Sequence, residues 1–166
     1  MKFCIMSHTE LTSGIQPCLP IALIIIDNPD DPPAEQPKWD KLVVCYRTCF
    51  YDLTPRVFRR VSGEKYIDKL ISNEQADELI RFAIQSSIID KVEMIIVSCT
   101  GGISRSPAVA AALSVVLDGP GMDMWVWESK TTLEDCQTHT KYEACRWQPN
   151  LYVYAKLIKR WRVWRL

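Results

Sequence analysis

The 166-residue sequence lacks an excess of charge of either sign. Its 20 basic and 20 acidic side chains cancel to a formal net charge of zero. Overall electrostatics therefore gives no reason to expect a nucleic-acid or membrane partner. Long apolar runs are also missing, because the longest, at 19–26, includes Pro20 and is far shorter than the roughly 20 residues that span a bilayer. Any anion-binding site must be local, and no membrane anchor is expected.

We expect neither a secretory leader nor a disulfide framework. The chain opens with Met-Lys-Phe-Cys-Ile-Met-Ser-His, and its seven cysteines are odd in number and irregularly spaced. We expect reduced thiols in a cytoplasmic protein. The length and the composition, 48% apolar and 24% charged, are typical of an ordinary globular chain. They predict one domain over residues 1–166, which we expect to be a monomer.

Metal-ligand spacing is missing too. Cys136, His139 and Cys145 come nearest to it, but a structural zinc site needs four ligands and no fourth is evident. We therefore expect neither a metal nor a cofactor. The C-terminal lysines and arginines beside Trp161 and Trp164 indicate a solvated helix face whose tryptophans pack inward, rather than a nucleic-acid or membrane surface.

Four short apolar runs predict strands buried on both faces, at 3–6, 21–26, 42–46 and 94–97. Three amphipathic or apolar segments predict helices, one capped by Ser72 with Gln75 and extending to Ile88, one at 104–117, and one from Pro149 to about Arg162. The last should turn Leu151, Tyr154, Leu157, Ile158 and Trp161 inward. Alternating strands and helices predict an α/β fold, a three-layer sandwich with a central, mainly parallel sheet flanked by helices.

One loop has the residues for phosphate chemistry, Cys99-Thr-Gly-Gly-Ile-Ser-Arg-Ser, between the fourth strand and the helix at 104–117. A phosphate dianion needs converging backbone amides at a helix N-terminus, and glycine permits the close approach. Arg105 adds a planar fork that matches two phosphate oxygens. The same groups favour a thiolate at Cys99, which can attack phosphorus and form a phosphocysteine. The predicted phosphate-binding residues are Thr100, Gly101, Gly102, Ile103, Ser104 and Arg105.

The loop resembles the signature of the protein tyrosine phosphatase superfamily, and Gly-Ile-Ser-Arg-Ser at 102–106 is most similar to dual-specificity and small bacterial or viral members. The resemblance implies a phosphatase-like fold and a phosphoric monoester hydrolase that acts on phosphotyrosine in a protein or on another phosphate monoester. It also implies that Ser106 donates a hydrogen bond to the sulfur of Cys99. The sequence departs at Ser98, where the family normally has a histidine that orders the loop.

The general acid that protonates the leaving oxygen should come from a separate segment. We favour Asp52, which follows the third strand, where Phe-Tyr-Asp at 50–52 resembles the acid loop of some small relatives. A plain loop-capping role for Asp52 has equal weight. Other candidate acids are Asp30, Asp31, Glu64 and Asp68. His8 would line the site only if the first strand lies beside the fourth.

Alternative functions stay open. A catalytically weak phosphate-binding module, or pseudophosphatase, would fit Ser98 and the uncertain acid. A thiol-based arsenate reductase or sulfurtransferase would need a second cysteine near Cys99. The plainest reading makes Cys99 a buried core thiol and Arg105 a helix cap.

Overall fold

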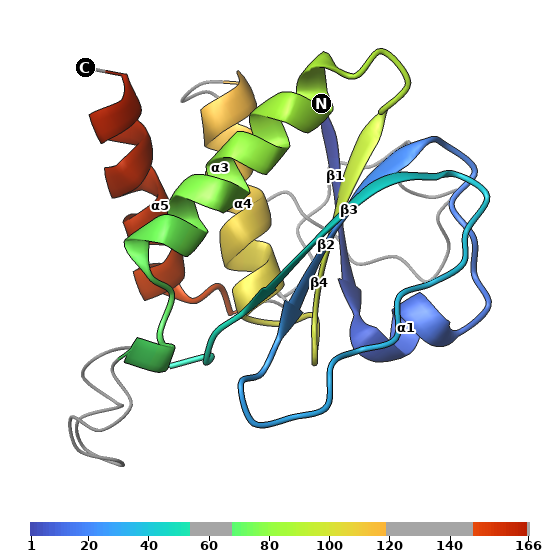
Figure 1. Ribbon diagram of the computed structural model, residues 1–166, viewed down its shortest axis with the longest axis horizontal. Coiled ribbons are helices and arrows are strands. Elements are labelled where there is room, and N and C mark those ends of the chain that lie inside the picture. The colour runs from blue at the N-terminus through green and yellow to red at the C-terminus, as the bar shows by residue number, and fades with distance from the viewer. Residues whose placement is uncertain (54–67, 119–147, 166) are drawn as a thin grey trace.

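A four-stranded parallel sheet forms the centre of the protein (Figure 1). In this computed structural model, the structure describes residues 1–53, 68–118 and 148–165. Across the sheet the strands lie in the order β1 (Lys2–Ser7), β4 (Met94–Cys99), β2 (Ile21–Asp27) and β3 (Leu42–Cys49). All neighbouring pairs are parallel. The strands β2, β3 and β4 begin at the predicted residues, and β1 begins one residue earlier. All four strands end beyond their predicted ends, by one residue in β1 and β2, three in β3 and two in β4.

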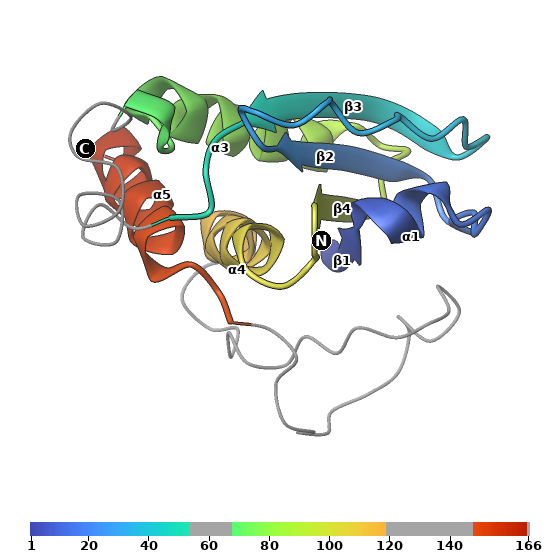
Figure 2. The ribbon, with the colours of Figure 1, turned by 90° about the horizontal axis from the view of Figure 1, so that it is seen from below.

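Helices cover both faces of the sheet (Figure 2). The helices α3 (Asn73–Ile88), α4 (Arg105–Asp118) and α5 (Leu151–Trp164) lie on one face, and the short helix α1 (His8–Thr12) lies on the other. Each face has its own apolar cluster: one contains the side chains of α3, α4 and α5, and the other contains Leu11 of α1 with Trp39. The predicted three-layer α/β sandwich is confirmed.

Burial differs between the central and the outer strands. Every residue of β2 and β4 is buried, as apolar runs in a parallel sheet predict. In β3 most residues are partly or fully exposed. The prediction that all four strands are buried on both faces is thus wrong for β3. Both β1 and β3 are edge strands, but α1 and α4 pack against β1, whereas α3 is the main described helix against β3.

The helix predictions are confirmed with local corrections. Ser72 and Gln75 form the predicted capping box of α3. The last helix begins at Leu151 rather than Pro149, because Asn150 caps it by accepting hydrogen bonds from the amides of Tyr152 and Val153. The Leu151 side chain is 64% exposed, so its predicted inward position is wrong. The sequence analysis missed α1, a single turn whose capping box joins Ser7 and Glu10.

The C-terminal tryptophans differ from each other. Trp161 packs against the larger apolar cluster, as predicted, whereas Trp164 is 40% exposed. In the part of the chain that the structure describes, no helix combines the length and apolar character needed to cross a membrane. Glu64, Cys136, His139 and Cys145, which the sequence analysis considered, lie outside the described residues.

Candidate functional site

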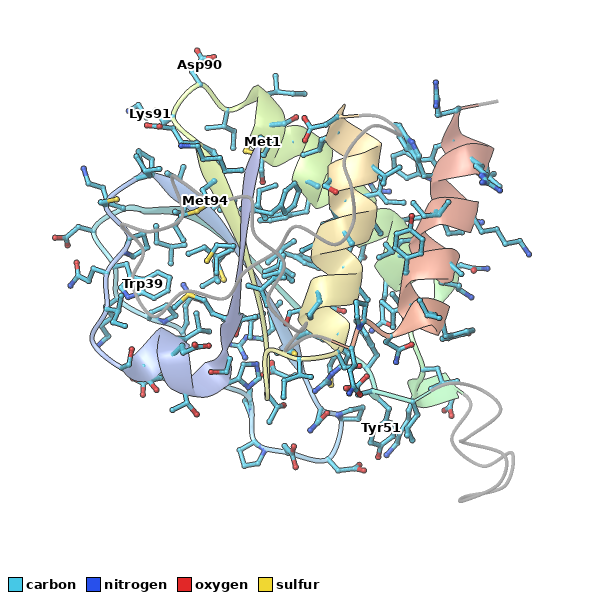
Figure 3. All side chains as sticks on the ribbon, turned by 180° about the vertical axis from the view of Figure 1, so that it is seen from behind. Met1, Trp39, Tyr51, Asp90, Lys91 and Met94 are labelled. Carbon is cyan, nitrogen blue, oxygen red and sulfur yellow. The ribbon has the colours of Figure 1, made fainter. Side chains whose placement is uncertain are left out.

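The candidate loop begins at the carboxyl end of β4, where the connections of two neighbouring strands diverge. After β1 the chain turns to α1 on one face, and after β4 it turns to α4 on the other. Such a switch between adjacent parallel strands opens a crevice that commonly holds ligands. The turn around Asp90 and Lys91 lies at the opposite end of the molecule from Tyr51, which follows β3 (Figure 3).

Cys99 and Ser106 meet at the base of this loop. The Cys99 sulfur lies 3.1 Å from the hydroxyl oxygen of Ser106, and the two residues are 2% and 0% exposed. Cys99 is the last residue of β4, and Ser106 lies in the first turn of α4. The strand and the helix therefore fix both partners, and the hydroxyl is close enough to donate a hydrogen bond to the sulfur.

The guanidinium of Arg105 is buried and held in place by backbone. Its Nη1 donates to the carbonyls of Asp27 at 3.0 Å and Phe50 at 2.8 Å. Asp27 ends β2, and Phe50 directly follows the neighbouring strand β3. Its Nη2 donates to the Thr100 hydroxyl oxygen at 3.2 Å. Its Nε is buried and has no hydrogen-bond partner among the described residues. A buried donor without an acceptor destabilises the folded protein, so the Nε–H group of Arg105 is suited to donate a hydrogen bond to a bound anion.

Glycine is required at one of the two candidate positions. Gly102 has a φ of +64°, and a Cβ built there would lie 2.9 Å from the Ser7 nitrogen and 3.1 Å from the Met6 carbonyl carbon. At Gly102 the loop therefore packs directly against the backbone at the end of β1. Its backbone there is in the left-handed region, which is unfavourable for residues with a Cβ atom. Gly101 has no positive φ, and a Cβ there would meet only the Ile103 side chain, at 3.7 Å or more.

Residues just before α5 form backbone hydrogen bonds to the last part of the loop, before α4. The amide of Gln148 donates to the carbonyl of Ile103 at 2.9 Å, and the amide of Asn150 donates to the carbonyl of Ser104 at 3.1 Å. Asn150 is buried and also caps α5. The sequence analysis missed this role, although an asparagine directly before an apolar helix is a helix-start signal that could have indicated it.

Asp52 lies beside the loop, as the sequence predicted. Its Oδ1 accepts hydrogen bonds from the Ser104 hydroxyl at 2.6 Å and from Asn150 Nδ2 at 3.0 Å. Its Oδ2 receives none from the described residues, and the residue is exposed. The arrangement allows both predicted roles, because Oδ1 connects two segments while Oδ2 accepts no hydrogen bond from the described residues.

The other described acids are engaged elsewhere or remote from these contacts. Asp30 forms an ion pair with Lys69 at 2.8 Å, and Asp31 accepts a hydrogen bond from Asn28. Asp68 is exposed in the turn before α3. None of the three has a contact with the loop in the described structure, so Asp52 is the acid best connected to it.

His8 lies next to the site, because β1 pairs with β4 and Ser7 is opposite Cys99. Burial lowers the pKa of His8 below 6.5, and the positive charges of Arg105 and Arg47 lower it further, while Asp27 acts in the opposite direction. The Nε2 of His8 and the hydroxyl of Ser98 are both buried without a partner among the described residues. Ser98 therefore gives the loop none of the hydrogen bonds expected of a histidine.

The described cysteines offer Cys99 no nearby thiol. Cys4 pairs with Ile96 while Cys99 pairs with Ser7, a separation of three residues along the strand, about 10 Å. Cys49 lies on β3, beyond β2 from Cys99, again about 10 Å across two strand spacings. A disulfide needs Cα atoms within about 7 Å. Among the described residues, the second cysteine that a thiol-transfer mechanism requires is missing.

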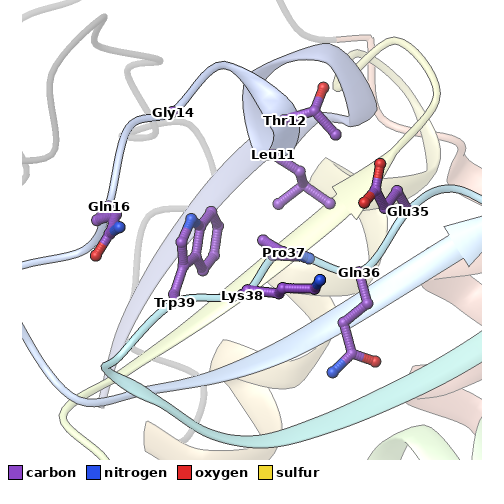
Figure 4. Close-up of a pocket in the computed structure, with 9 residues that line it drawn as sticks. All are labelled: Leu11, Thr12, Gly14, Gln16, Glu35, Gln36, Pro37, Lys38 and Trp39. Atoms are coloured by element: carbon purple, nitrogen blue, oxygen red, sulfur yellow. The ribbon is translucent and has the colours of Figure 1, made fainter.

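A separate pocket lies on the α1 face (Figure 4). It has a volume of about 280 Å³ and is lined by Leu11, Pro37 and Trp39 with the polar side chains of Glu35 and Lys38. None of its lining residues belongs to the 99–106 loop. It is therefore distinct from the candidate site.

Comparisons with known proteins bear on the fold. No protein-family model matches the chain, and no curated protein matches it in sequence. Among solved structures, it is similar to the crystal structure of Tk-PTP, a protein tyrosine phosphatase, in the active form. The match has a TM-score of 0.50 and 17% sequence identity, and it covers 95% of this chain and 90% of Tk-PTP. At this identity the similarity concerns the fold, and it confirms the predicted phosphatase-like architecture.

Proposed function

We propose that this protein is a cysteine-dependent phosphatase that hydrolyses phosphate monoesters at the 99–106 loop. The observation that carries the proposal is the buried Arg105 fork, fixed by two strand-end carbonyls with its Nε unpaired, in the same loop as the Cys99–Ser106 contact. A core cysteine and a helix cap would explain neither the buried guanidinium nor the unpaired donor. A bound phosphate oxygen would satisfy that donor.

In the first step, the Cys99 thiolate attacks phosphorus in line with the leaving oxygen. A sulfur–phosphorus bond forms, the phosphorus–oxygen bond to the substrate breaks, and the leaving oxygen takes a proton from Asp52. Arg105 and the first-turn amides of α4, which have no acceptor inside the helix, stabilise the charge on the phosphoryl oxygens. The Oδ2 of Asp52 is the oxygen available for this proton.

In the second step, water hydrolyses the phosphocysteine. Asp52, now a carboxylate, accepts a proton from the water as it attacks phosphorus, and the sulfur–phosphorus bond breaks. Ser106 donates a hydrogen bond to the departing thiolate and so stabilises its negative charge, which the 3.1 Å separation allows. Nucleophile, anion binding and proton transfer all come from side chains and backbone, so the proposal includes no cofactor.

The substrate class in this proposal is a phosphorylated protein, with phosphotyrosine first, and the protein acts as a cytoplasmic monomer. Four of the described cysteines, Cys18, Cys45, Cys49 and Cys99, are free thiols, in keeping with a reducing compartment.

The test uses purified protein and p-nitrophenyl phosphate at pH 5 to 7. We expect hydrolysis that Cys99→Ser abolishes and that Arg105→Lys lowers strongly, since lysine lacks the planar fork. Cys18→Ser, which changes an exposed cysteine, should leave the rate unchanged. Absence of hydrolysis by the wild type, or full activity in Cys99→Ser, would show that the enzyme proposal is wrong.

Two observations favour a second candidate, a phosphate-binding module without turnover. The hydroxyl of Ser98 has no hydrogen-bond partner among the described residues, and Asp52 accepts two hydrogen bonds as a tether would. This candidate predicts that a phosphotyrosine peptide binds with an affinity that depends on Arg105 and is released unhydrolysed. Mass spectrometry of the recovered peptide separates the two functions.

A further inference from the structure

A groove of about 520 Å³ follows the outer edge of β3. Its floor is the strand segment Tyr46, Arg47, Thr48 and Cys49, and its walls come from two different elements. Gln75 and Glu78 of α3 stand on one side, and the loop at 28–33 stands on the other. Because four consecutive residues of one strand line it, the groove runs along the strand backbone.

The backbone of this edge is available for pairing. Backbone groups of alternate residues in a strand point to opposite sides. The amide of Phe50 points inward to Asp27, whereas the carbonyl of Cys49 points outward and accepts from Gln75 Nε2 at 2.8 Å. The backbone groups of Cys45 and Arg47 share the orientation of Cys49. No other described strand pairs with this edge of the sheet, so it can accept an added strand.

The groove reaches the phosphate-binding site. Asp27 lines one end of it, and the carbonyl of the same residue holds Arg105 Nη1. Cys49, also in the lining, directly precedes Phe50, whose carbonyl is the other anchor of Arg105. A chain lying in the groove would therefore run toward the carboxyl edge where Cys99 and Arg105 lie.

The groove has a net negative charge. Asp27 is neutralised by Arg47, with 2.5 Å between their charged atoms. Asp31 and Glu78 are exposed, and their hydrogen-bond partners among the described residues are neutral, the Asn28 amide and the Tyr46 hydroxyl. Two carboxylates that form no ion pair with a described residue thus stand on opposite walls of the groove. They complement a cationic segment and repel an acidic one.

We propose that the β3 edge binds the polypeptide segment beside the phosphorylated residue as an added strand, and that it selects segments rich in lysine or arginine. This inference rests on the proposed function, and it makes the substrate a phosphoprotein with a basic flanking segment rather than a small phosphate ester. The carboxylates of Asp31 and Glu78 provide the charge selection, and the backbone of Cys45 and Arg47 provides the strand pairing.

The charge selection is tested by fluorescence anisotropy with the Cys99→Ser variant, which needs no turnover. Two phosphotyrosine peptides share one core and carry either three lysines or three glutamates beside it. We expect tighter binding of the lysine peptide. Glu78→Gln and Asp31→Asn, which retain acceptors for Tyr46 and Asn28, should each weaken its binding about two- to fivefold. Asp90→Asn, at the far end of the molecule, is the matched control.

The strand pairing is tested with N-methylated lysine peptides. Amides of alternate residues point to the same side of a strand, so two peptides methylated at either the odd or the even amides test one side each. The set that faces β3 should weaken binding about tenfold when methylated, and the other set should have little effect. Equal affinity for the lysine and glutamate peptides, or equal effects of the two registers, would overturn the inference. Hydrolysis of p-nitrophenyl phosphate by the wild type is scored separately and decides the proposed function by itself.

Discussion

Replacing Gly102 with alanine adds one Cβ atom, which should destabilise the 99–106 loop. The φ of +64° costs an alanine about 1–2 kcal/mol. The new Cβ would also lie 2.9 Å from the Ser7 nitrogen and 3.1 Å from the Met6 carbonyl carbon. Both contacts are with the backbone of β1, which cannot rotate away as a side chain would. Overpacking of this kind costs a further 1–3 kcal/mol or so. We expect Gly102→Ala to lose about 2–5 kcal/mol of unfolding free energy.

Gly101→Ala is the matched control, one residue away in the same loop. Its Cβ would meet only the Ile103 side chain, at 3.7 Å, and its backbone has no positive φ. We expect a change within about 0.5 kcal/mol. Urea unfolding followed by tryptophan fluorescence gives both free energies, and p-nitrophenyl phosphate gives the activity. If the two variants were equally stable and equally active, the inferred packing of Gly102 on β1 would be refuted.

Three further variants probe the surroundings of the loop. Asp52→Asn should lower kcat for a phosphotyrosine peptide about 10²-fold or more, since the amide cannot protonate the leaving oxygen; an unchanged kcat would leave only the tethering role. Asn150→Ala should lose about 1–2 kcal/mol in urea unfolding, because it removes the cap of α5; a stability equal to the wild type would contradict that cap. The folded-state pKa of His8 is depressed below 6.5, so the unfolded chain binds its proton first as the pH falls. His8→Gln should therefore reduce the loss of Tm between pH 7 and 5, and an unaltered pH dependence would exclude His8 as its source.

The sequence predicted those features that depend on local pattern. Apolar runs located the four strands, and the Ser72–Gln75 pair located the start of α3, because strand burial and helix capping act over a few residues. The Cys99–Ser106 contact was predicted through a family resemblance. The hydrogen bonds of Arg105 to distant segments were not predicted. The carbonyls of Asp27 and Phe50 reach Arg105 only because β2 and β3 end beside the loop.

Strand order explains why the exposed edge of the sheet was missed. The apolar run at 42–46, on which the strand prediction was based, does not distinguish an edge strand from a central one, so the exposure of β3 and the groove along it were missed. His8 was considered as a site residue only on the condition that the first and fourth strands are neighbours, which the sheet satisfies. The helix α1 was missed because a five-residue turn is too short to show an apolar period.

The way in which Arg105 is held affects the thermodynamics of anion binding. A flexible arginine on a surface loses rotamer freedom when it grips a ligand, at about 0.5–1.5 kcal/mol for a side chain of this kind. Here the strand-end carbonyls and Thr100 immobilise the guanidinium through its Nη atoms during folding. That entropy is lost before any ligand arrives. Anion binding should therefore show a small entropic penalty, with the fork preorganised by the sheet itself.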